Sequence, residues 1–353
     1  MPLLRTSSSR LKRRTAHRVA DAGVIVPFTE MVVALLGQSN MVNLSQSTLN
    51  YPLADQQARR WTGSAWGYCG NVDLTNTYPP DTLSSTYGAT YTSVAPHGDG
   101  LVYFVNRLRS EMAAPVRTFE YASSGSNISQ WQPLTGGLYE AFKAASISAD
   151  TYCNAAIYYQ GEDNANAGTS SASYQSSLLS ILNGLKADTI KPNFKMGVVC
   201  LGPGTTYATE GNMGIIRSAH LDFVAAHASD GAYLAACAHD MNLAGSNIHI
   251  DAASQARMGK RYAKGLLNQF GYLPYGAEGP KISSATRSGA VVTVNISQNG
   301  GTALADGAGG SGSALLGFRV YDAGSPCTIS STVISGNTVV LTLSATPAGS
   351  VTM

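Results

Sequence analysis

The chain has 353 residues and a mass of 36.8 kDa, enough for about two domains. Only 12% of its residues are charged, against the usual ~25%, and 23 basic and 21 acidic side chains give a net charge of +2. This balance excludes an overall electrostatic case for nucleic acid binding, and the 44% apolar content excludes disorder over most of the chain. No apolar run approaches the ~20 residues of a membrane span.

Residues 1–30 form a basic N-terminal arm, in which arginine and lysine side chains accumulate before the first acid, Asp21. The apolar stretch of about 7–15 residues that a signal peptide needs does not follow them, so we expect no signal peptide. Two interpretations stay open: a loosely attached tail, or a docking arm onto an acidic partner in a larger assembly. Together with the low charge, the arm favours an extracellular or virion-associated protein.

Residues 31–275 alternate apolar segments of β type with longer amphipathic segments. The pattern predicts strands over 32–36, 116–121, 155–159, 195–201 and 232–237, and helices over 100–112, 138–146, 171–186, 213–227 and 251–269. Strands that are apolar throughout, each followed by a helix, predict an α/β domain with a parallel sheet covered on both faces. Ligands bind such sheets beyond the carboxyl ends of the strands. The long segment 42–97 reads as a loop that builds part of a site.

Residues 280–353 change in character, because short β-type segments separated by Gly, Ser and Asn replace the helix signals. We expect a small β-sandwich-like accessory domain with strands over 291–297, 315–321, 328–334 and 338–343. The last residues, 350–353, read as the start of a further strand. The edge of this domain is therefore expected either to be incomplete or to be completed by another chain.

Four short stretches follow the predicted strands and carry the residues suited to chemistry. They are Gly-Gln-Ser-Asn-Met at 37–41, Ser-Ser-Gly-Ser-Asn-Ile-Ser-Gln-Trp at 123–131, Gln-Gly-Glu-Asp-Asn-Ala at 160–165, and Asn-Ile-His-Ile-Asp at 247–251. In this order they resemble the SGNH hydrolase superfamily, and within it the sialate O-acetylesterase and acetylxylan-esterase-like branch. The resemblance spans about residues 31–269 and implies a three-layer α/β/α, flavodoxin-like hydrolase domain.

This resemblance implies a serine esterase that removes O-acetyl groups from a polysaccharide or a sialic-acid-like sugar, without metal or cofactor. Ser39 would be the nucleophile and His249 its general base. The oxyanion hole would consist of the backbone N–H groups of Ser39 and Gly125 and the side-chain amide of Gln160. Two alternatives stay open, since Gly125 also suits a simple turn and Gln160 also suits a tie between two loops.

The sequence departs from the family three residues before the histidine, where Ser246 occupies the position of the usual aspartate. Losing the acid that orients such a histidine can reduce turnover by ~10⁴. Three acidic residues could replace the missing aspartate. Asp240 would either orient His249 or make a structural loop bond, Glu162 would brace its own block, and Asp251 fits a helix N-cap.

The implied substrate site further includes Asn40, Trp131, Glu162 and His97. Trp131, with Trp61 and Trp66, offers flat apolar faces to sugar rings, and the competing interpretation is that each tryptophan packs within a loop core. His97 stands where the long loop ends and is expected to line the pocket.

Two functions of different class follow. The first is a carbohydrate O-acetylesterase acting on an O-acetylated glycan. The second is a catalytically weakened module of the same fold that binds glycans or serves a structural role, for instance on a phage tail or capsid surface. In the second case the N-terminal arm or the C-terminal β-edge would contact the larger assembly.

Overall fold

The computed structural model describes residues 28–42, 58–61, 66–68, 100–148, 152–189, 191–244, 248–276, 279–298, 304, 318, 320–323 and 325–352. The chain divides into two units, Met1–Ala277 and Glu278–Met353. Across these described ranges, no helix combines the length and apolar character that crossing a bilayer requires.

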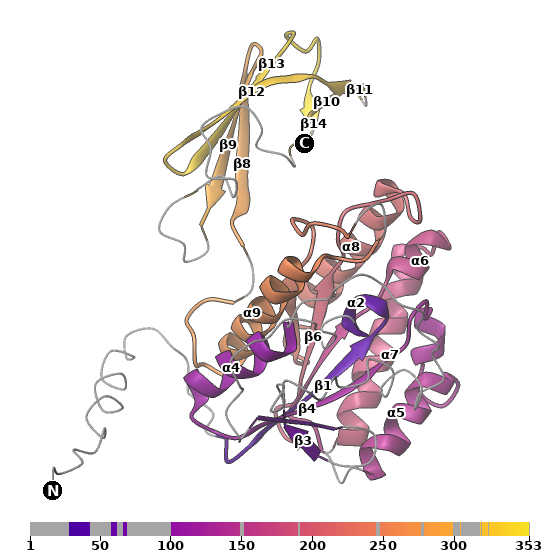
Figure 1. Ribbon diagram of the computed structural model, residues 1–353. Coiled ribbons are helices and arrows are strands. Elements are labelled where there is room, and N and C mark those ends of the chain that lie inside the picture. Colours follow the sequence, from indigo (N-terminus) through magenta and orange to yellow (C-terminus); the bar gives the residue numbers. More distant parts are fainter. Residues whose placement is uncertain are drawn as a thin grey trace, which may run out of the picture. The chain divides into compact units, whose positions relative to one another are not determined.

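A seven-stranded sheet in the order β3-β2-β4-β1-β5-β6-β7 organises the first unit (Figure 1). All neighbours pair in parallel except β3, which runs antiparallel to β2. The strands are β1 (Met31–Gly37), β2 (Ala58–Trp61), β3 (Trp66–Tyr68), β4 (Val116–Ala122), β5 (Ala155–Tyr159), β6 (Lys195–Cys200) and β7 (Ala232–Cys237).

Helices cover both faces of this sheet: α4 and α9 lie on one face, and α5, α7 and α8 lie on the other (Figure 1). The helical elements are α2 (Ser39–Val42), α4 (Gly100–Met112), the 3₁₀ turn η2 (Ile128–Trp131), α5 (Gly137–Ser148), α6 (Glu162–Asn166), α7 (Ser171–Thr189), α8 (Glu210–His227) and α9 (Ala252–Gln269). The predicted three-layer α/β/α fold is confirmed.

The core explains why these segments form these elements. Every residue of β1 and β5 is buried, as expected for central strands with helices on both sides. On α9 the apolar residues Met258, Tyr262 and Leu266 recur every four positions and are all fully buried. Asp251 caps this helix by accepting a hydrogen bond from the Ser254 N–H at 2.7 Å, so the predicted N-cap is confirmed.

The prediction of one long loop over 42–97 is wrong in part. Two short strands, β2 and β3, lie within that segment and pair with each other through Trp61 and Trp66. They are four and three residues long, too short to show the alternation by which a strand is recognised in a sequence.

The second unit contains a four-stranded antiparallel sheet in the order β12-β13-β9-β8 and a three-stranded one in the order β11-β10-β14. Its strands are β8 (Lys281–Ser288), β9 (Val291–Ser297), β10 (Val320–Asp322), β11 (Ser325–Cys327), β12 (Ile329–Ser335), β13 (Thr338–Leu343) and β14 (Val351–Thr352). A small apolar cluster around Val294 and Leu341 forms its core. The strand expected at the end of the chain exists as β14, and it pairs with β10 of the same chain.

Candidate active site

The carboxyl end of β1 is the switch point of the sheet, because β2 to β4 lie on one side of β1 and β5 to β7 lie on the other. Hydrogen bonds hold the three strand ends together: Ser123 N–H donates to the Gly37 carbonyl, and Gln38 N–H donates to the Tyr159 carbonyl, both at 2.9 Å. Three of the four sequence stretches therefore begin side by side, as the sequence predicted.

Gly37 sets the shape of the turn that carries the serine. Its φ is +138°, and a Cβ at this position would lie 2.0 Å from the Tyr159 carbonyl oxygen, so no side chain fits. Gln38 is buried and its Oε1 accepts from the Gly161 N–H at 3.2 Å, which ties the turn to the third stretch. Ser39 then begins the short helix α2 with 3% of its surface exposed.

Asn40 connects this turn to the histidine. Its Nδ2 donates to the Ile248 carbonyl at 3.1 Å, and its Oδ1 accepts from the Ile250 N–H at 3.1 Å. One side chain thus binds the backbone on both sides of His249. An isolated antiparallel bridge between Leu243 and Ile250 closes the same segment. The residue next to the serine therefore fixes the histidine segment beside it, although the two are separated by about 210 positions.

Glu162 holds the same Asn40 nitrogen that binds the Ile248 carbonyl, since its Oε1 accepts from Asn40 Nδ2 at 2.8 Å. It is 1% exposed, and its other oxygen, Oε2, has no hydrogen-bond partner in the described part of the chain. Burial raises the pKa of Glu162 from 4.5 to about 7, against the opposing effect of the Asn40 hydrogen bond. Asn40 and Glu162 were assigned to the substrate site, and Glu162 was alternatively expected to brace its own stretch. In the structure both are buried and bonded to each other, which makes them positioning residues.

Gln160 is also held by the protein. Its Nε2 donates to the Ser126 carbonyl at 2.9 Å and to Asn164 Oδ1 at 2.7 Å, which uses both amide hydrogens. The Tyr174 hydroxyl lies 2.9 Å from its Oε1. The expectation that this amide donates to an oxyanion is therefore corrected: in this structure Gln160 ties the second and third stretches together, which was the alternative.

Gly125 lies in the tight turn after β4, where Ser126 N–H bonds back to the Ser123 carbonyl at 3.3 Å. Its φ is +65°, a left-handed conformation that favours glycine, and nothing lies within 4 Å of where a Cβ would be. The residue is exposed and follows the strand next to β1. A donor role and a turn role are both compatible with this geometry.

Trp131 was expected to offer a face to sugar rings, and this prediction is wrong. The side chain is fully buried and its Nε1 donates to Ser126 Oγ at 3.1 Å. Its ring meets Tyr121 and Tyr158 edge to face, with centroids 6.3 and 5.9 Å apart. The competing interpretation, packing within the core, is the correct one.

Asp240 was a candidate for orienting His249, and the structure gives its carboxylate another role. Its oxygens accept from Arg261 at 2.6 and 2.7 Å and from Arg257 at 2.8 Å, so it binds helix α9. These guanidinium groups hold the pKa of Asp240 below its usual range despite partial burial. Asp240 is thus the structural loop bond of the two alternatives.

Ser246 and His97 lie outside the described residues, so their predicted roles stay predictions. Within the described ranges, no group of three His, Cys, Asp or Glu side chains could hold a metal ion.

The sequence analysis missed that Asn40 links the serine turn to the histidine segment and that Asn164 links the second and third stretches. Asn164 accepts from the Ile128 N–H at 2.9 Å as well as from Gln160. Both are asparagines inside the motifs, which was the available signal.

The sequence and the fold were compared with protein-family models and with solved structures. Residues 29–268 match the family model described as carbohydrate esterase, sialic acid-specific acetylesterase. A carbohydrate acetylesterase from Xanthomonas citri aligns with a TM-score of 0.65 at 18% identity, covering 91% of this chain and 74% of that one. An Arabidopsis thaliana protein aligns with a TM-score of 0.55 at 18% identity, covering 69% of this chain and 100% of that one. No curated protein matches the chain.

Proposed function

This chain belongs to the carbohydrate esterase family of sialic acid-specific acetylesterases, and from that premise we propose that it removes O-acetyl groups from a carbohydrate with Ser39 as nucleophile and His249 as base. The observation that carries the proposal is the double hydrogen bond of Asn40 to the backbone on both sides of His249. It brings the segment that carries His249, the only histidine among the four sequence stretches, to the residue next to the serine.

In the acylation half of the reaction, Ser39 Oγ attacks the carbonyl carbon of the acetyl ester while His249 accepts the hydroxyl proton. The carbonyl π electrons move to the oxygen, and the resulting oxyanion is stabilised by the backbone N–H groups of Ser39 and Gly125. When the intermediate collapses, the bond from the acetyl carbon to the sugar oxygen breaks. His249 returns its proton to that oxygen, which releases the sugar alcohol and leaves an acetyl ester on Ser39.

In the second half, water attacks the acetyl-enzyme while His249 again accepts a proton. Collapse of this intermediate breaks the bond to Ser39 Oγ, which recovers its proton from His249, and acetate leaves. The histidine carries a positive charge in each transition state, so its orientation matters in both halves. The hydrogen bonds of Asn40 fix the backbone around His249. That the Ser246 hydroxyl binds the imidazole ring remains a prediction.

The test is acetate release from a panel of O-acetylated glycans by the full chain. Ser39→Ala should abolish release without changing the melting temperature, while Ser129→Ala, which removes an exposed hydroxyl of the second stretch, should leave the rate unchanged. An unchanged rate in Ser39→Ala would remove Ser39 from the mechanism.

The second candidate function is a weakened glycan-binding module, which the serine at position 246 favours. Ser246→Asp separates the two. If the missing carboxylate limits the rate, acetate release should rise, and if another group fills the role it should not. Wild type and Ser39→Ala that both bind glycan but release no acetate would support the weakened module. An extracellular or virion location, with the N-terminal arm or C-terminal β-edge as contact, stays a prediction.

A further inference from the structure

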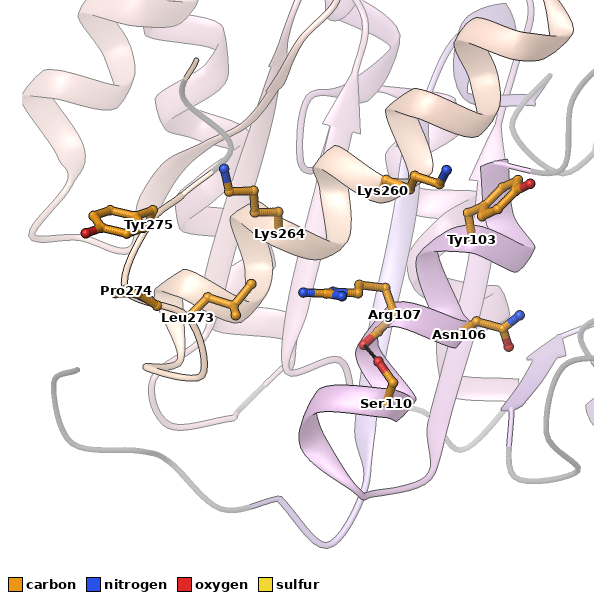
Figure 2. A pocket seen from close by; sticks show the side chains of 9 residues that line it. All are labelled: Tyr103, Asn106, Arg107, Ser110, Lys260, Lys264, Leu273, Pro274 and Tyr275. Atoms are coloured by element: carbon orange, nitrogen blue, oxygen red, sulfur yellow. Dashed lines mark hydrogen bonds between the residues drawn. The ribbon is translucent and has the colours of Figure 1, made fainter. Parts of the chain in front are cut away.

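A cavity of about 540 Å³ is lined by α4, α9 and the segment after α9 (Figure 2), and none of its lining residues belongs to the four sequence stretches. Its volume falls within the usual range of small-molecule sites. Helix α4 lines it with residues spaced three and four apart, which share one helix face, and α9 and the segment after it complete the wall. The lining residues are Tyr103, Asn106, Arg107, Ser110, Lys260, Lys264, Leu273, Pro274 and Tyr275.

The charge of this cavity is one-sided, because its lining holds three cations and no acid. Arg107 pairs with Glu111 at 3.0 Å, yet its side chain keeps 48% of its surface exposed. Lys260 lies over the Tyr103 ring, 4.4 Å from the centroid. Lys264 forms no ion pair or hydrogen bond within the described residues. In a chain with only 12% charged residues, three cations around one hollow constitute a local positive field.

Aromatic surface accompanies these charges. Tyr275 is 50% exposed, and Figure 2 shows it at one end of the cavity beside Lys264, with Tyr103 beside Lys260 at the other end. A sugar ring packs on such a face through its apolar C–H groups, and a carboxylate on the ring would reach the neighbouring cations. Tyrosine faces flanked by lysines fit an acidic saccharide better than a neutral one, because a neutral ligand offers no counter-charge to Lys260 and Lys264.

The cavity is also distinct from the reaction centre. Helix α9 begins just after His249, and the cavity residues Lys260 and Lys264 lie 8 and 12 residues past its first residue, about 12 and 18 Å along the helix. A single sugar does not span this distance, whereas a saccharide chain of several units does. We propose that this cavity is a second, non-catalytic site that binds a carboxylate-bearing saccharide unit of an acidic polysaccharide. The inference rests on the proposed function, whose substrate class it narrows to polymers with acidic residues.

Calorimetric titration of the full chain with oligomers of sialic acid and of uronic acid, free of O-acetyl groups, tests the proposal. Wild type should bind one of them, and the carboxyl-reduced form of that oligomer should not bind. Lys264→Glu should weaken binding about tenfold, about 1.4 kcal/mol, and added salt should weaken it further. Lys191→Glu makes the same charge change at an exposed residue outside the cavity and should have no effect.

Three results would overturn the proposal: no binding of either acidic oligomer, equal loss in Lys264→Glu and Lys191→Glu, or equally tight binding of inorganic phosphate or of a single-stranded oligonucleotide of matched charge. The last result would mark a non-selective anion surface. Hydrolysis of a small acetyl ester, measured in parallel, reports on the motif residues alone. Ester hydrolysis without oligomer binding would refute the cavity proposal and support the proposed esterase function. Oligomer binding without ester hydrolysis would support the cavity proposal and refute the proposed esterase function.

Discussion

Replacing Asn40 by alanine tests whether the clamp on the histidine segment is a device for catalysis or only for stability. The change removes one buried side chain and its hydrogen bonds to three groups: the Ile248 carbonyl, the Ile250 N–H and Glu162 Oε1. Each such loss costs about 1–3 kcal/mol when the group stays buried. Because water can enter the space that the side chain vacates, we expect the low end, about 3 kcal/mol in the free energy of unfolding.

For a unit of this size, 1 kcal/mol shifts the melting temperature by about 2–4 °C, so Asn40→Ala should melt roughly 6–12 °C below wild type. The larger effect should fall on turnover, since a displacement of about 1 Å of a catalytic group can cost ~10² in rate. Acetate release at a temperature where the variant stays folded should therefore fall at least about a hundredfold in kcat, with little change in KM.

Asn154→Ala is the matched control. Asn154 Oδ1 accepts from the Val32 N–H at 2.8 Å, so it braces the opposite end of β1 with the same kind of side chain. This variant should lose stability and keep its kcat. An Asn40→Ala enzyme with a lowered melting temperature and wild-type kcat would refute the reasoning, because the clamp would then stabilise the fold without positioning His249.

Three further predictions concern groups near the motifs. Because burial raises the pKa of Glu162 to about 7, the folded state binds a proton that the unfolded state releases above about pH 4.5, so wild type should lose roughly 3 kcal/mol of stability between pH 4.5 and 7. Unfolding of Glu162→Gln by urea at pH 5 and pH 8 should lack this drop, and an equal drop in both proteins would contradict it. Gly37→Ala should lower the free energy of unfolding by several kcal/mol, because its Cβ meets the Tyr159 carbonyl. Gly168→Ala, also at positive φ but facing open space, should lower it by about 1 kcal/mol. Equal shifts in the melting temperatures of the two variants would refute the steric argument. Trp131→Ala should lower stability by about 3–5 kcal/mol, and a loss confined to glycan affinity would restore the sugar-contact interpretation.

The sequence predicts the α/β scaffold well for a physical reason. In central strands such as β1 and β5, burial on both faces demands apolar residues at every position, which leaves an unbroken signal. The strands that the sequence analysis missed are not buried on both faces, so their sequences need no continuous run of apolar residues. Every residue of β8 is exposed, so its polar sequence carries no pattern that separates it from a loop.

The candidate site was predicted at the level of motifs and less well at the level of side-chain roles. The order of the strands places the motif loops at one sheet edge, and this follows from topology alone. Whether an amide faces a ligand or a neighbouring loop depends on contacts between distant segments. Gln160 and Asn40 both belong to motifs, yet their amide hydrogens are used by Ser126, Asn164 and Ile248, among others, which no local pattern reveals.

The bond between Asn40 and Glu162 has a consequence for how such a protein can change over generations. The amide of Asn40 and one carboxyl oxygen of Glu162, 122 residues away, form a buried hydrogen bond, so altering either residue alone leaves a buried group without that bond. Drift at these positions must therefore proceed through paired replacements or through a less stable intermediate. In descendants of this chain that retain the histidine segment, the two residues should be inherited together or replaced together.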